Sequence, residues 1–265
     1  MNYYDKENRI IECLQNTSLR NIRFVNFSAG LFRFCLSLYA PFMYRYWTDN
    51  SGKNNTPPDF YSDEYKYMLE VMRFDDYEPG SNNPNAIESK RIKAINDERR
   101  KNGLNLFDNE HLVLYLNPDI SMSSLNNFDI YYANFCRVTN NHNSKCDAYR
   151  SAHPGYKLGF LLFDESPAYG ETKDKYIGTP YAGDLVGPLR YVYTPYVRKF
   201  FDQLMLLNVN YVIWVTPFKQ LPTFDSRGII NAYAIDIDKA KKKQVKSINY
   251  DENKILCLEA NERDE

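Results

Sequence analysis

The sequence is poor in several residues on which recognisable sites and modules depend. Its 265 residues include only two tryptophans, three histidines and five cysteines, and the cysteines are scattered (Cys13, Cys35, Cys136, Cys146 and Cys257). An odd and scattered set does not form a disulfide framework, so we expect a reducing compartment and a cytoplasmic protein. The net charge is also small. The formal value of −1 gives no overall basic field that would point to nucleic acid.

Long apolar runs are also missing. The most apolar stretch, residues 29–47, is interrupted by Arg33, Pro41 and Arg45. It falls short of the roughly 18 continuous apolar residues that a membrane-spanning helix needs. The first residues carry charges where a signal peptide has an apolar core. We therefore expect a soluble chain without a membrane partner.

Tyrosine (23), phenylalanine (16) and asparagine are abundant instead, a bias typical of an AT-rich genome. Tyrosine also suits binding surfaces, because it combines a large contact area with a polar tip. One hypothesis for the function is therefore a non-catalytic interaction protein, of phage or mobile-element type, that grips a protein partner through tyrosine-rich loops.

Hydrophobic periodicity predicts an α+β fold: a mixed β-sheet with flanking helices. Helices are expected over residues 5–16, from Ser62 onward and over 86–102, and a hairpin over 21–39. The strand candidates in the C-terminal part are residues 111–117, 128–138, 156–163, 189–194, 210–216, 229–237 and 254–260.

A helix pattern over residues 194–208 lies between two of these strand candidates, with Pro195 at its first position. This order predicts one right-handed β-α-β crossover near residues 189–216. The chain length suits a single globular domain over residues 1–265. Within it, the polar and loop-rich residues 47–109 are expected to form a helical insertion or lid.

The first candidate site lies where the apolar run Leu158–Phe163 ends in Asp164 and Glu165, with His153 shortly before it. Catalytic groups gather at the carboxyl ends of strands, so this pattern predicts an acidic centre. The corresponding function is an intracellular hydrolase or transferase acting on a nucleotide or nucleic acid. Asp164 and Glu165 would bind a divalent metal or serve as acid and base, and His153 would handle a proton. The alternative is that charged residues simply end a buried strand.

Three other motifs, each typical of enzymes that process nucleotides, give weaker signals than this acidic centre. An NTPase is excluded, because the only Gly-Lys pair, Gly52-Lys53, lacks the other residues of a phosphate-binding loop. A nuclease core of the Asp…Glu-x-Lys type would use Asp164, Glu171 and Lys173. The acidic pair Asp236 and Asp238 follows an apolar run, as in metal-dependent glycosyltransferases, although charged residues usually form a solvated face.

Residues 136–153 suggest a third hypothesis for the function, a zinc-stabilised binding module. Cys136, His142, Cys146 and His153 fall within this short span, and thiolate and imidazole are the ligands that tetrahedral zinc prefers. The spacing matches no standard zinc finger, and unrelated core and loop residues are the alternative.

Overall fold

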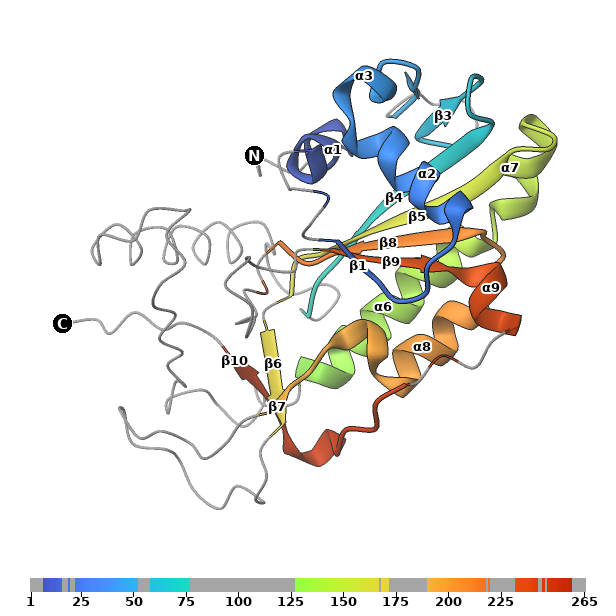
Figure 1. The fold of residues 1–265 in the computed structure, drawn as a ribbon. Coiled ribbons are helices and arrows are strands. Elements are labelled where there is room, and N and C mark those ends of the chain that lie inside the picture. Colours follow the sequence, from blue (N-terminus) through green and yellow to red (C-terminus); the bar gives the residue numbers. More distant parts are fainter. Residues whose placement is uncertain are drawn as a thin grey trace, which may run out of the picture.

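Buried apolar strands build a seven-stranded mixed sheet, which lies between two helical layers (Figure 1). The computed structural model describes residues 7–15, 19, 22–51, 58–76, 127–166, 168–171, 190–217, 219, 232–242, 245 and 247–258. The strands follow the order β1 (Ile22–Phe24), β9 (Ala232–Asp236), β8 (Tyr211–Val215), β5 (Lys157–Asp164), β4 (Tyr67–Phe74), β3 (Phe60–Ser62) and β2 (Thr48–Asp49). The predicted α+β class with a mixed sheet is confirmed.

Three neighbouring strands at the centre of the sheet, β4, β5 and β8, run parallel. Their carboxyl ends therefore meet at one edge, where the polar residues that follow them come close together. Strand β9 is antiparallel to β8, and β1 is parallel to β9. On the other side, β3 is antiparallel to β4 but pairs only with residues 67–69, the first part of that strand.

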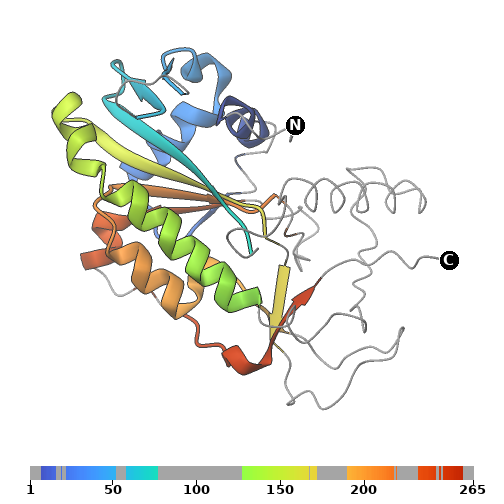
Figure 2. The same ribbon diagram turned by 180° about the vertical axis from the view of Figure 1, so that it is seen from behind.

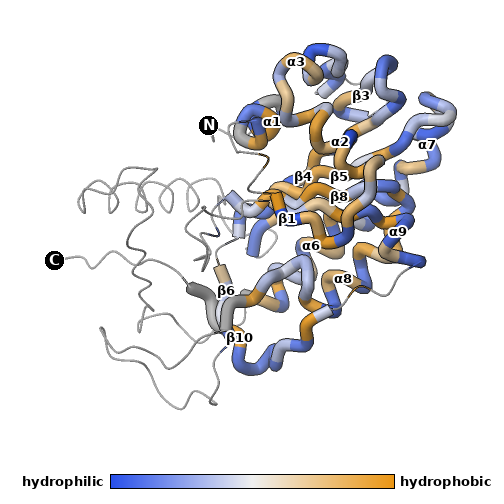
Figure 3. Tube along the Cα trace, in the orientation of Figure 1, coloured by the Kyte–Doolittle hydropathy of each residue, from blue (hydrophilic) through white to orange (hydrophobic). Residues whose placement is uncertain are grey.

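One face of the sheet is covered by α1 (Glu7–Gln15), α2 (Ala29–Tyr39) and the short α3 (Pro41–Tyr44) (Figure 1). Close contact of α2 with the sheet requires a glycine at position 159, because a Cβ there would lie 2.2 Å from Cζ of Phe34. The hydropathy of the chain follows these layers, since the most hydrophobic stretches lie in the central strands (Figure 3).

The opposite face is covered by α6 (Asn127–Asn143), α8 (Arg198–Met205) and α9 (Ile237–Lys242), with α7 (Cys146–Ala152) continuing from α6 (Figure 2). Aromatic side chains dominate this part of the core. The indole of Trp214 stacks on Phe135 of α6, with ring centroids 4.9 Å apart. Within the described residues, no helix combines the length and apolarity needed to cross a membrane.

A second, three-stranded sheet corrects one detail of the predicted crossover. Strand β6 (Ala168–Glu171) lies between β10 (Ile255–Leu258) and β7 (Arg190–Tyr191), and both neighbours are antiparallel to it. A strand, a helix and a strand do follow each other over residues 189–216. However, β7 and β8 belong to different sheets, so this segment connects the two sheets instead of forming a crossover within one.

Two predicted strands are helices. Residues 31–39 form most of α2, since Ser28 caps this helix by accepting a hydrogen bond from the backbone N–H of Leu31 at 3.0 Å. Residues 128–138 lie in α6, where Phe128, Tyr131 and Phe135 form a buried stripe at helical spacing. Alternating apolar letters fitted a strand in both segments, but the same apolar positions also match a helical period.

The segment after Ser62 shows the opposite error. A helix was expected there, but residues 67–74 form strand β4. Nearly every residue of β4 is buried, so apolar residues lie on both of its faces, and such a run matches helical spacing by chance. The helix expected over 86–102 and the strand expected over 111–117 lie outside the described residues. So does most of the expected polar insertion over 47–109, which stays a prediction.

Candidate active site

Asp164, the first residue of the predicted acidic centre, is the acceptor in a fully buried polar cluster at the end of β5. Its Oδ2 accepts hydrogen bonds from Tyr131 Oη at 2.5 Å, Trp214 Nε1 at 2.9 Å and Lys219 Nζ at 2.6 Å. Its Oδ1 accepts from the backbone N–H and the hydroxyl of Ser166. We call these five residues the Asp164 cluster. Both oxygens are occupied and the charge is paired with a lysine, so the geometry favours a structural role.

Glu165 also has a cationic partner. Its Oε1 accepts from Nε of Arg73 at 2.9 Å and from Nη2 at 2.5 Å, and its backbone N–H donates to the carbonyl of Phe74. This ion pair joins the ends of β4 and β5. The two predicted acids are therefore close in the fold, but each is paired with a basic side chain instead of converging on a common point. Their predicted catalytic role stays a prediction.

His153 lies at the opposite end of β5 from Asp164, because it precedes the strand. Its ring packs against Tyr61, with centroids 4.6 Å apart, and against Tyr156. A strand of eight residues thus separates this histidine from the two acids. The structure does not bring the three predicted catalytic residues together.

The four proposed zinc ligands do not converge either. His142 bonds to Glu70, the Sγ of Cys146 contacts the carbonyl of His142, and His153 packs on tyrosine rings. Burial raises the pKa of the Cys146 thiol to about 12, which opposes the thiolate form that zinc needs. Among the described residues, no group of three or more His, Cys, Asp or Glu side chains is placed to hold a metal ion.

In the nuclease-type motif and in the acidic pair, the described carboxylates accept hydrogen bonds from other residues of the fold. Glu171 lies in β6 and its carboxylate accepts the backbone N–H of Asp251, while Lys173 lies outside the described residues. In the acidic pair, Asp236 accepts from Ser28 and from the backbone N–H of Lys239 at the start of α9. The side chain of Asp238 accepts from Asn210.

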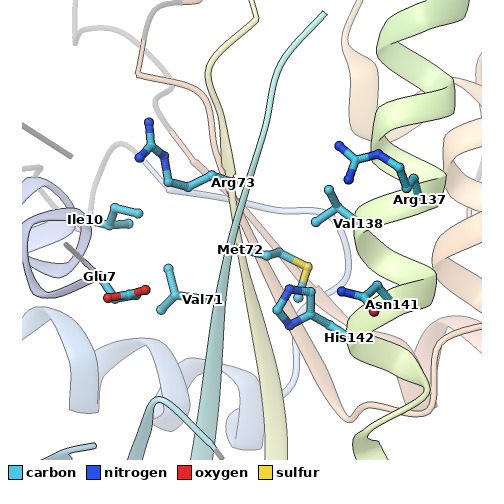
Figure 4. Close-up of a pocket in the computed structure, with 9 residues that line it drawn as sticks. All are labelled: Glu7, Ile10, Val71, Met72, Arg73, Arg137, Val138, Asn141 and His142. Carbon is cyan, nitrogen blue, oxygen red and sulfur yellow. The ribbon is translucent and has the colours of Figure 1, made fainter. Parts of the chain in front are cut away.

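A cavity of about 300 Å³ opens between α1, β4 and α6, beyond the point where β3 stops pairing with β4 (Figure 4). We call it the edge cavity. Its lining includes two guanidinium groups, one carboxylate and one imidazole among apolar side chains. The lining residues are Glu7, Ile10, Val71, Met72, Arg73, Arg137, Val138, Asn141 and His142.

His142 reaches from α6 toward β4 on the wall of this cavity (Figure 4). Its Nδ1 lies 2.8 Å from Oε1 of Glu70, and the side chains are 20% and 5% exposed. Tyr149 donates a second hydrogen bond to the same oxygen at 2.8 Å. In the described part of the chain, Nε2 of His142 has no hydrogen-bond partner. A buried carboxylate thus fixes one ring nitrogen and leaves the other for a ligand, the arrangement of an oriented acid–base histidine.

Asp59 extends this buried network beneath the cavity. Its backbone N–H donates to Oε2 of Glu70, and its side chain accepts the backbone N–H of Val71 at 2.8 Å. Burial, and then the negative charge of Glu70, raise the pKa of Asp59 from 3.8 to about 7. The carboxyl group of Asp59 therefore keeps its proton to a higher pH than an exposed aspartate does.

This raised pKa predicts a pH-dependent stability. Between about pH 4 and pH 7 folded Asp59 keeps a proton that the unfolded chain has lost, so its contribution to stability falls as the pH rises. Asp59→Asn keeps the acceptor for Val71 and removes the charge. We expect the variant to be more stable than the wild type at pH 8 by about 1–3 kcal/mol, with a smaller gain at pH 5.

Urea unfolding at the two pH values measures this difference, with the exposed Asp202→Asn as the control variant. An equal effect of Asp59→Asn at both values would contradict the assignment.

The sequence contained the residues of this site but not the signal that they belong together. In the sequence, the surroundings of His142 indicated only a zinc ligand, and Glu70 and Arg137 lie within stretches whose apolar residues dominate the pattern. Glu70 in the buried run YMLEVM was the available signal, because a carboxylate inside a buried strand needs a polar partner.

No protein-family model matches the chain, and neither do any of the curated proteins or solved structures.

Proposed function

We propose that this protein is a hydrolase that acts on a small phosphorylated substrate, a nucleotide being the expected class, and that the edge cavity is its active site. The observation that carries the proposal is the pair of Glu70 and His142 on the cavity wall. Glu70 holds Nδ1, so His142 can exchange a proton with a water or leaving group at Nε2. Of the expected hydrolase or transferase, this proposal keeps the hydrolase, and it assigns the reaction to residues other than Asp164, Glu165 and His153.

The charges around the cavity support an anionic substrate. Arg73 and Arg137 face a single carboxylate there, that of Glu7. Arg73 is held by Glu165, whereas Arg137 donates only to the amide oxygen of Asn134, at 3.4 Å, within the described residues. An arginine without a carboxylate partner can donate two parallel hydrogen bonds to a phosphate.

The size and the lining of the cavity further restrict the class of substrate and the type of reaction. About 300 Å³ is at the lower end of the usual range for ligand sites, which favours a small molecule over a polymer. No serine, threonine or cysteine is among the described lining residues. Attack by a water molecule that His142 activates therefore fits this cavity better than a covalent intermediate on a side chain.

Arg137→Gln tests the substrate-binding part of the proposal. We expect KM to rise at least about tenfold with little change in kcat, because Arg137 would hold the phosphate in both the ground state and the transition state. The assay is release of inorganic phosphate from a panel of nucleoside mono-, di- and triphosphates. The control is Arg198→Gln, because Arg198 is an exposed arginine of α8 that is not part of the cavity lining. A variant with unchanged KM, or a wild type inactive on the whole panel, would contradict the proposal.

The interaction-protein hypothesis also has one observation in its favour. Phe27 and Phe32 are 58% and 39% exposed, and their rings pack together with Phe24. Exposed aromatic clusters of this kind suit protein contacts. Nothing in the described residues indicates a partner for them, and the oriented histidine in a cavity makes the enzyme the better-supported function.

A further inference from the structure

A cluster of one arginine and four tyrosines lies at the other side of the main sheet, away from the edge cavity. Arg23 of β1 is the register partner of Tyr233 of β9, so their side chains stand next to each other on one face. Tyr193, Tyr196 and Tyr250 complete the set, which we call the Arg23 cluster. It is independent of the edge cavity, because β5 and β8 separate β9 from β4.

Arg23 is exposed and is held by aromatic rings instead of an acid. Its guanidinium carbon lies 5.2 Å from the ring centroid of Tyr196 and 5.9 Å from that of Tyr193. No carboxylate forms an ion pair with Arg23 in the part of the chain that the structure describes. Stacking on a ring occupies the faces of a guanidinium and leaves the N–H groups along its edge able to donate.

Tyr233 supplies a second, independent observation. Its side chain is only 1% exposed, yet among the described residues its hydroxyl has no hydrogen-bond partner. The ring of Tyr196 lies at 6.0 Å, and the backbone N–H of Tyr193 donates to the hydroxyl of Tyr250. Burial raises the pKa of Tyr233, which keeps its hydroxyl protonated and able to donate. A buried donor without an acceptor calls for an explanation, and a bound anion provides one.

We propose that the Arg23 cluster is a second binding site, for a phosphate group. Its functional groups are a guanidinium edge and phenol hydroxyls, which are donors for an oxyanion, and among the described residues no carboxylate pairs with Arg23. A phosphate, with several acceptor oxygens in a compact group, matches this set better than a single carbonyl. The phosphate belongs either to a free small molecule or to a nucleic-acid backbone, and the two sources share this chemistry.

The experiment uses the full-length protein with Arg137→Gln, so that any contribution of the edge cavity is weakened. Inorganic pyrophosphate and a single-stranded oligothymidylate are titrated by calorimetry. Adding Arg23→Gln should weaken binding of the tighter probe at least tenfold. The matched control is Arg45→Gln, because Arg45 also lies over a tyrosine ring, that of Tyr46 at 4.8 Å, but outside the cluster. The tighter probe indicates whether a free or a nucleic-acid phosphate is the natural source.

The variant Tyr233→Phe distinguishes an effect on phosphate binding from an effect on stability. Removal of a buried hydroxyl without a partner should leave Tm unchanged or raise it by about 2–4 °C. The same variant should weaken binding about three- to tenfold, because one donor to the phosphate is lost. Affinities that agree within twofold between Arg23→Gln and Arg45→Gln, or the absence of binding of both probes, would overturn the proposal. Neither outcome bears on the edge cavity, which is tested by phosphate release and by the NMR signals of His142.

Discussion

Asp164→Ala is expected to destabilise the protein by about 3–5 kcal/mol, a large part of the stability of a typical domain. The reason is the charge that remains. Lys219 is 3% exposed, and its ammonium group lies 2.6 Å from Oδ2 of Asp164. Without the carboxylate, a buried lysine is left unpaired. Tyr131 and Trp214 also lose the acceptor of their hydrogen bonds, and both side chains are fully buried.

Two further variants give this prediction a control and a rescue. The double variant Asp164→Asn/Lys219→Met removes both charges and keeps an acceptor oxygen, so it should recover most of the lost stability. Asp202→Ala removes an acid of an exposed ion pair on α8 and should change stability by less than about 0.5 kcal/mol. Urea unfolding measures all three. If Asp164→Ala were no more damaging than Asp202→Ala, the buried pair would not have the structural role assigned to it.

Strands of the sheet were predictable where both faces of the strand are buried and where clear turn residues mark its two ends. The segments around β5, β8 and β9 are short apolar runs with β-branched and aromatic residues, and each was correctly predicted as a strand. In the segments that became α2, β4 and α6, the apolar positions fit a period of 2 and a period of 3.6 about equally well. Tertiary packing decides such segments, and a single sequence does not contain that information.

The candidate site was less predictable for a different reason. Asp164 and Glu165 were recognised because they follow an apolar run, and they do lie at the expected edge of the sheet. What the sequence could not show is that Lys219 and Arg73, from distant parts of the chain, pair with them. The contact between Glu70 and His142 likewise joins residues 72 positions apart. Long-range pairing of this kind becomes visible only once the topology is known.

His142→Gln is expected to lower kcat by about 100- to 10,000-fold, the usual contribution of a general acid or base. The substitution keeps a polar side chain on α6 but removes the group that can exchange a proton near neutral pH. KM should change little, since Arg137 still holds the substrate. The assay is again phosphate release from the nucleotide panel.

Glu70→Gln distinguishes an oriented histidine from a merely structural one. Glutamine keeps an oxygen to accept from Tyr149 but removes the negative charge beside the imidazole of His142, so the hydrogen bonds can remain while the charged acid–base pair is lost. We expect kcat to fall with little change in KM, whereas loss of a merely structural contact would not lower kcat selectively. His153→Gln is the matched control, because that histidine packs on tyrosine rings at the far end of β5. A loss of kcat in His153→Gln equal to that in His142→Gln would count against the assignment.

The most direct test of the central claim is NMR of the histidine rings in ¹⁵N-histidine-labelled protein during a titration with inorganic phosphate and pyrophosphate. The chain has only three histidines, so each ring can be assigned by single substitution. We expect the ligand to shift the Nε2 signal of His142 and to leave the His153 signals in place, and we expect Arg137→Gln to raise the ligand concentration at the midpoint of the shift at least about tenfold. A His142 signal that is unchanged at saturating ligand, or a midpoint that is the same with Arg137→Gln, would contradict the edge cavity as the active site.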